Sequence, residues 1–200
     1  MNVVVVDLGL GNLGSVLQAL ARAGGEVQLS DDPTTLGRAP RVVLPGVAAF
    51  GLGMERAARF KPALQDALAR KAPVLGICLG MQLLFEEGEE DGGRKGLGLL
   101  PGRVTRLPAG VQVPHIGWQK LQRVSDSPLQ PGGWAYFAHS YRCEAPAELT
   151  QAVVEHGPVR IAAAVGSGTL FGVQYHPEKS AQDGEALLRR FLALPEGAAP

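Results

Sequence analysis

Residues 76–80 read Gly-Ile-Cys-Leu-Gly and place one of only two cysteines between two glycines, directly after an apolar run. A Gly-x-nucleophile-x-Gly turn between a strand and a helix is typical of a nucleophile elbow, in which the nucleophile is strained and exposed. The dipole of the following helix favours the thiolate, the reactive form of a thiol. The motif therefore predicts that Cys78 is a nucleophile, against the alternative of a buried cysteine that packs as a small hydrophobe.

A candidate base and acid follow a late strand-like segment, in Gln174-Tyr-His-Pro-Glu178. His176 could take the proton of Cys78, and Glu178 could orient and stabilise the resulting imidazolium. A His-x-Glu pair alone is common in exposed loops. Combined with a cysteine elbow at another strand exit of the same sheet, where such sheets bind ligands, it predicts a catalytic triad.

Donors for an oxyanion are expected at a third strand exit, Leu44-Pro-Gly-Val47. Acyl transfer needs hydrogen-bond donors for the developing negative charge, and free backbone N–H groups beside a glycine can supply them. We expect the N–H groups of Val47 and Leu79 to form this oxyanion hole. A plain Pro-Gly turn is the alternative interpretation of the same residues.

A rival function is suggested near the start, where residues 9–14 satisfy Gly-x-Gly-x-x-Gly between a strand and a helix. Asp31 and Asp32 end the next strand, near where a ribose-binding acid of a dinucleotide site would lie. Asp7 opposes this interpretation because it places a negative charge directly before the loop that a pyrophosphate would approach. A non-catalytic nucleotide-binding module, with Cys78 inert, remains the alternative.

The first half of the chain alternates strand and helix patterns. Strands are expected at residues 3–6, 27–29, 41–44 and 74–77, and helices at 16–23, 54–70 with a break near Pro62, and 79–85. Such βαβ alternation predicts a mostly parallel sheet covered by helices.

From about residue 96 the pattern changes to short strand-like stretches separated by Gly and Pro, some of which we expect to pair antiparallel. A closing helix is outlined by Ala186, Leu187, Leu188 and Phe191. We expect one α/β domain over residues 1–200, with an open, mostly parallel sheet flanked by helices and an additional antiparallel part. The stretches in question are 103–107, 118–124, 134–138, 152–155, 160–165 and 170–175.

Composition excludes several other classes of protein. Lys plus Arg equals Asp plus Glu at 19 each, so no charge excess indicates nucleic acid or an anionic membrane as partner. The first residues resemble no signal peptide, and no stretch approaches the roughly 20 apolar residues of a membrane span. Cys78 and Cys143 have no CxxC spacing, so we expect neither disulfide nor zinc site, and a reducing cytoplasm as the location.

Together GICLGMQLLF, LPGV and GVQYHPEKS resemble the class I glutamine amidotransferases. In that family a cysteine takes the acyl group of glutamine and releases ammonia, and His and Glu complete the triad, which here implies Cys78, His176 and Glu178. No metal or organic cofactor is implied. The resemblance further implies substrate contacts: Gln82 for glutamine, Glu90 for its ammonium group, Gly46 in the oxyanion loop, and His139, Ser140 and Tyr141 along the substrate backbone.

Residues 7–13, 113–118 and 136–142 resemble one branch of this family, the glutaminase subunits of imidazole glycerol phosphate synthases in histidine biosynthesis. The resemblance implies a heterodimer with a separate (β/α)₈ cyclase that receives the ammonia. It places Asn12, Trp118 and Lys179 at that interface. The alternatives are a turn former, a core aromatic and a solvated charge.

Three positions depart from the pattern of this branch: Leu8 replaces Tyr, Ala48 replaces Gly and Gln119 replaces Asn. None of them belongs to the triad. A stand-alone cysteine hydrolase, for instance a γ-glutamyl peptidase, would use the same triad without a partner and remains the second alternative.

Overall fold

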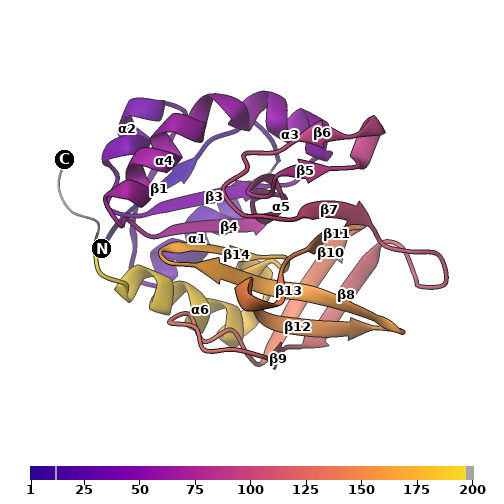
Figure 1. Ribbon diagram of the computed structural model, residues 1–200. Helices are drawn as coiled ribbons and strands as arrows, with labels where there is room; N and C mark the ends of the chain where they lie inside the picture. The colour runs from indigo at the N-terminus through magenta and orange to yellow at the C-terminus, as the bar shows by residue number, and fades with distance from the viewer. Residues whose placement is uncertain (12, 197–200) are drawn as a thin grey trace.

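The computed structural model describes residues 1–11 and 13–196. A central eight-stranded sheet has its first five strands parallel and its last three antiparallel (Figure 1). The expected α/β class, with a largely parallel sheet and an antiparallel part, is confirmed. In spatial order the strands are β2 (Glu26–Ser30), β1 (Asn2–Val6), β3 (Val42–Gly46), β4 (Val74–Cys78), β14 (Leu170–Val173), β13 (Val159–Ser167), β12 (Thr150–His156) and β9 (Gln122–Arg123).

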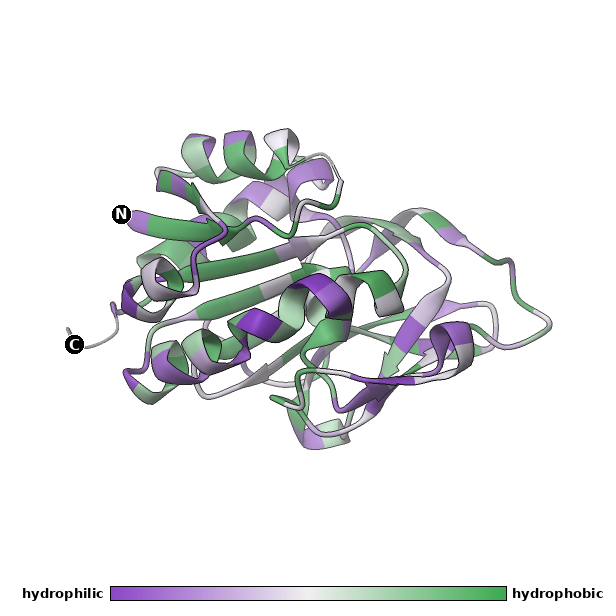
Figure 2. Ribbon diagram, turned by 90° about the horizontal axis from the view of Figure 1, so that it is seen from above, coloured by the Kyte–Doolittle hydropathy of each residue, from purple (hydrophilic) through white to green (hydrophobic). Residues whose placement is uncertain are grey.

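Apolar residues on both faces of the strands fix the layers. Val3 and Val5 of β1 belong to one buried cluster, and Val4 and Val6 belong to another, because successive side chains point to opposite faces. Figure 2 shows hydrophobic colour along the strands and an alternation of colours on the helices. One face is covered by α1 (Gly14–Arg22) and α6 (Ala181–Ala193), the other by α2 (Pro33–Arg38), α3 (Phe50–Ala57), α4 (Lys61–Ala69) and α5 (Leu79–Leu83).

The helix expected over residues 54–70 is two helices, α3 and α4, separated by a 3₁₀ turn at Ala58–Phe60. Pro62 lies in the first turn of α4, where its missing N–H removes no intrahelical hydrogen bond. Further 3₁₀ turns lie at Glu90–Gly92, Ala147–Leu149 and Pro177–Lys179. Within the described residues, no helix is long and apolar enough to cross a membrane.

The remaining strands form two small sheets near the ends of β4 and β14 (Figure 1). In the first, β8 (His115–Lys120) pairs antiparallel with β10 (Trp134–His139). The second contains β11 (Tyr141–Glu144), β7 (Arg103–Arg106), β5 (Glu87–Gly88) and β6 (Arg94–Lys95), of which β11, β5 and β6 were not expected from the sequence.

Strand β3 is longer than predicted, because it continues through Pro45 and Gly46. Its parallel register with β4 places Pro45 beside Ile77 and Gly46 beside Cys78. The Pro-Gly pair is therefore part of the sheet and not a turn after it. The extension places Gly46 directly next to the proposed nucleophile.

Candidate active site

Cys78 is the last residue of β4, and α5 begins at the next residue. Its backbone has φ 53° and ψ −109°, in the left-handed half of φ space that non-glycine residues rarely adopt. The flanking glycines are required by packing: a Cβ at Gly80 would overlap the carbonyl oxygen of Leu44, and a Cβ at Gly76 would lie 2.8 Å from the backbone of Gly80. The glycines thus allow α5 to start against β3 with the cysteine held at a strained corner.

We expect Gly80→Ala to lower the free energy of unfolding by about 3 kcal/mol, because the added methyl meets a backbone carbonyl that cannot rotate away. Urea unfolding followed by circular dichroism measures the change. Gly132→Ala is the matched control, since its Cβ would meet nothing closer than 3.8 Å. An unfolding free energy for Gly80→Ala equal to that of Gly132→Ala would contradict the close packing of the elbow.

Strand register brings three separate motifs to one edge of the sheet. Gly46 of β3 pairs with Cys78 on one side of β4, and Val173 of β14 pairs with Ile77 on the other. The residue after Val173, Gln174, therefore lies next to the thiol, and its side-chain Nε2 is 3.8 Å from Sγ. His176 follows two residues later.

His176 is engaged by both of its expected triad partners. Its Nδ1 donates to Oε1 of Glu178 over 2.8 Å, and the two side chains are 4% and 5% exposed. Burial lowers the pKa of His176, but the hydrogen bonds that it donates to Cys78 and Glu178, and the negative charge of both, outweigh burial and raise this pKa to about 9. Since Glu178 occupies Nδ1, Nε2 is the nitrogen that faces the thiol, as proton transfer requires.

A cavity of about 480 Å³ opens beside Cys78. Of the expected oxyanion and substrate residues, all except Gly46 line it. Its walls come from the loop after β3, from α5, from the acidic segment of residues 86–91 and from β8 and β10. The lining residues are Val47, Ala48, Ala49, Cys78, Leu79, Gln82, Glu90, Arg106, Pro114, Ile116, Ala138, His139, Ser140 and Tyr141.

Gln82 has its donors fixed inside the protein. Its Nε2 donates to the carbonyl oxygen of Tyr141 at 3.2 Å and to Oε1 of Gln174 at 3.1 Å. An amide nitrogen has two hydrogens, so these bonds use both. The side-chain oxygen is the polar atom that Gln82 can offer to a ligand, and it can accept from a substrate N–H group.

Glu90 joins the acidic segment to the start of α3. Its Oε2 accepts the N–H of Phe50, the first residue of that helix, over 2.6 Å. This bond holds the carboxylate on the cavity wall, where it suits a cationic group. Val47, on the loop just before α3, is half exposed.

The glycine loop at the start of the chain packs against Val47, in the expected oxyanion loop. Gly11 has φ +81°, and a Cβ there would overlap the side chain of Val47. Asp7 accepts the N–H of Gly9 over 2.7 Å, and Asp32 caps α2 through the N–H groups of Thr34 and Thr35. Asp7 and Asp32 are thus engaged within the protein, whereas Asp31 is exposed and lies 3.9 Å from Arg59. Asn12 lies outside the described residues.

An apolar patch covers the outer face of β8 and β10, beside the cavity. Ile116, Trp118 and Trp134 are 58%, 48% and 54% exposed, so the interpretation of Trp118 as a core aromatic is wrong. The Trp118 and Tyr136 rings are 5.9 Å apart, and exposed Lys179 places its Nζ 5.8 Å from the centre of the Tyr136 ring. Three neighbouring side chains therefore continue the patch toward the triad.

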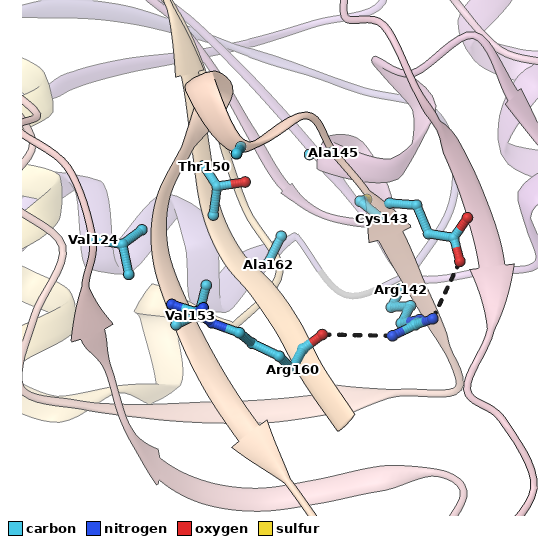
Figure 3. A pocket seen from close by; sticks show the side chains of 10 residues that line it. Val124, Arg142, Cys143, Ala145, Thr150, Val153, Arg160 and Ala162 are labelled. Atoms are coloured by element: carbon cyan, nitrogen blue, oxygen red, sulfur yellow. Dashed lines mark hydrogen bonds and ion pairs between the residues drawn. The ribbon is translucent and has the colours of Figure 1, made fainter. Parts of the chain in front are cut away.

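The second cysteine lies in a different environment. Cys143 is buried on β11, and burial raises the pKa of its thiol well above the ordinary value. It lines a separate cavity of about 420 Å³, shown in Figure 3, where Arg142 bonds to Glu144 and to the carbonyl of Arg160. No group of three His, Cys, Asp or Glu side chains within the described residues could hold a metal ion.

Three residues of the site were not identified from the sequence: Gln174, Tyr136 and His115. Gln174 stands in the quoted His-containing motif, but its contact with the thiol depends on the pairing of β14 with β4. Tyr136 and His115 lie in the motifs of the second half. The two-residue period of a strand could have placed them on opposite faces, but neither strand alternates apolar with polar residues to show which face is buried.

Comparisons with known proteins agree in one family. The family described as "Glutamine amidotransferase class-I" matches residues 4–194. "Imidazole glycerol phosphate synthase subunit HisH" of Symbiobacterium thermophilum is 48% identical over 193 residues, 93% of this chain and 91% of that protein. The protein with the same description from Halobacterium salinarum is 46% identical over 96% of this chain and 92% of its own length.

Solved structures support the fold. A structure titled "Crystal structure of glutamine amidotransferase" has a TM-score of 0.74 and 21% identity, over 94% of this chain and 96% of that one. A chain from "Structure of PurLQS from Thermotoga maritima" has a TM-score of 0.73 and 22% identity, over 96% and 97%. At these identities, the likeness concerns the fold alone.

Proposed function

The chain belongs to the class I glutamine amidotransferase family, and from that premise we propose that it is the glutaminase subunit of an imidazole glycerol phosphate synthase. It would hydrolyse glutamine to glutamate and ammonia and pass the ammonia to a cyclase. The observation that carries the proposal is the contact of His176 with both Glu178 and Cys78, the last of which lines the cavity. Relatives matched along most of the chain bear the synthase subunit's description.

In the proposed reaction, the Cys78 thiolate attacks the carboxamide carbon of glutamine and forms a C–S bond. The N–H groups of Val47 and Leu79 would stabilise the oxyanion, and Leu79 suits this role because the first N–H groups of a helix have no intrahelical acceptor. His176 gives its proton to the leaving nitrogen, which departs as ammonia. Water, deprotonated by His176, then cleaves the thioester and releases glutamate.

For the substrate we propose contacts along the cavity wall. Glu90 would pair with the ammonium group of glutamine, and Gln82 would accept a substrate N–H through its side-chain oxygen. Ser140 and Tyr141 would border the substrate backbone, together with the backbone of His139. Gly46, next to Cys78, would let the oxyanion loop change the orientation of its peptide.

We propose that ammonia passes to a (β/α)₈ cyclase in a heterodimer, and that this cyclase acts on a phosphorylated ribulosyl aminoimidazole carboxamide nucleotide. The apolar patch supports this, since exposed aromatic residues are typical anchors of interfaces and this patch lies beside the cavity. Lys179 would pair with a carboxylate of the cyclase, and Asn12 would face it. Residues 1–200 are proposed to act as one domain.

The cytoplasm is the location that we propose for the protein. The proposed reaction needs Cys78 as a free thiol or thiolate, and a reducing compartment keeps it so. Both cysteines are free in the structure, which supports this proposal.

Lys179→Ala and Trp118→Ala are each expected to weaken the stimulation of the glutaminase by partner and nucleotide about tenfold. Lys179 would lose a partly desolvated ion pair and Trp118 an aromatic anchor, and each of these contributes roughly 1–3 kcal/mol to the binding free energy. The assay compares glutamine-dependent with ammonia-dependent synthase turnover in the reconstituted pair. Ammonia-dependent turnover should stay unchanged. Arg189→Ala, which removes an exposed charge on α6, is the control. If both variants keep wild-type binding, stimulation and turnover ratio, the docking face is misplaced.

A further inference from the structure

A network of hydrogen-bonded, buried polar side chains outside the triad connects Cys78 with the inner face of β8 and β10. Gln174, Gln82, His139 and His115 are at most 6% exposed. Gln174 contacts the thiol of Cys78, and Gln82 links Gln174 to the carbonyl of Tyr141. His139 Nδ1 lies 2.8 Å from the same carbonyl oxygen, and His115 Nδ1 lies 2.9 Å from His139 Nε2.

The Tyr141 carbonyl fixes the direction of every hydrogen bond in this network, because a carbonyl oxygen can only accept. Gln82 must therefore present its NH₂ group to Tyr141, and its second N–H goes to the oxygen of Gln174. The NH₂ group of Gln174 is then the group that faces Sγ. Neither side-chain amide of this network, Gln82 or Gln174, can be flipped without the loss of a hydrogen bond.

The same carbonyl fixes both histidine tautomers. His139 must carry its proton on Nδ1, so its Nε2 accepts and His115 must donate from Nδ1. This leaves Nε2 of His115 as a buried lone pair without a partner. Burial lowers the pKa of His115 to about 4 and that of His139 to about 3, so both rings stay neutral and keep these tautomers.

We propose that Gln174 is a further catalytic residue, which donates an N–H to the Cys78 thiolate, and that His139 and His115 are positioning residues that hold the Tyr141 carbonyl for Gln82. The proposal rests on the proposed function, in which Cys78 is the nucleophile. Two donors then face the sulfur, the His176 imidazolium and the Gln174 amide. A donor to the charged form favours the thiolate, both before attack and when the sulfur leaves the thioester.

The first test measures the rate of Cys78 alkylation by iodoacetamide against pH in the isolated chain. Gln174→Met keeps the length of the side chain and removes the donor, so we expect the pH midpoint of alkylation to rise by about one unit. Two titratable groups, His176 and Cys143, interact with Cys78, and both are unchanged in this variant. Gln151→Met is the control, because Gln151 is also a buried, hydrogen-bonded glutamine.

An unchanged midpoint in Gln174→Met, or an equal rise in Gln151→Met, would overturn the catalytic role of Gln174. The readout is independent of glutaminase activity. If Cys78 is not the nucleophile, Cys78→Ser keeps glutamine hydrolysis in the complex with the cyclase, and the proposed function fails instead. The two failures are therefore distinguishable.

The second test separates positioning from mere structure. In the complex with the cyclase, His139→Leu removes the donor to Tyr141 and is expected to raise the KM for glutamine about tenfold, with a smaller change in kcat. His139→Asn restores an N–H at the position of Nδ1 and should recover most of the KM. Equal KM values for Leu and Asn variants of equal thermal stability would overturn the positioning role.

Discussion

Cys78→Ser is expected to abolish glutamine hydrolysis, with turnover falling at least about 10⁴-fold, because a serine hydroxyl at this elbow is not ionised and forms no thioester. Cys143→Ser should stay within a few-fold of wild type, since its thiol is buried in another cavity. Glutamate release from glutamine measures both variants. The contrast tests which of the two thiols carries the reaction.

The same assignment has a chemical readout. A glutamine-analogue electrophile should label Cys78, and mass spectrometry of the digested protein should find the mass increase on the peptide that contains it. Prior incubation with glutamine should slow labelling. Label confined to Cys143, or full activity of Cys78→Ser, would contradict the site.

The isolated chain is expected to hydrolyse glutamine poorly, and the cyclase with its nucleotide should raise turnover about 10²- to 10³-fold, the usual value of aligning one oxyanion donor. This alignment can occur at the Gly46–Val47 peptide, because glycine tolerates either peptide orientation. Val47 is half exposed and lines the same cavity as Ile116 of the apolar patch. Steady-state glutaminase rates with and without partner and nucleotide provide the measurement. Full activity of the isolated chain would favour a stand-alone cysteine hydrolase.

The sheet and the elbow could be predicted because local patterns determine them. The β-branched run of β1 and the glycines around Cys78 indicate their structure without reference to distant residues. Strand β11 could not be predicted, because its four residues, Tyr-Arg-Cys-Glu, alternate over too short a stretch to indicate a strand and pair with β7, about 40 residues earlier in the sequence. The extension of β3 through Pro45 likewise depends on its partner, β4.

The candidate site divides in the same way. The triad candidates stand in compact motifs, whereas the contact of Gln174 with Cys78 arises from two strands about a hundred residues apart in sequence. His139 stands in a motif whose resemblance implies a substrate contact, yet both of its ring nitrogens are engaged inside the protein. That fact depends on the distance between β8 and β10 and on the turn into β11, which no local pattern contains.

One isotope experiment tests most directly whether ammonia made at Cys78 feeds a cyclase. The reconstituted pair receives glutamine labelled with ¹⁵N in its side-chain amide, the cyclase nucleotide, and an excess of unlabelled ammonium. We predict that the imidazole product carries ¹⁵N despite the unlabelled pool, and that the pair containing Cys78→Ser makes only unlabelled product. Product labelled no more than the ammonium in solution would contradict the account, because the ammonia would then be released to water and not passed between the two proteins.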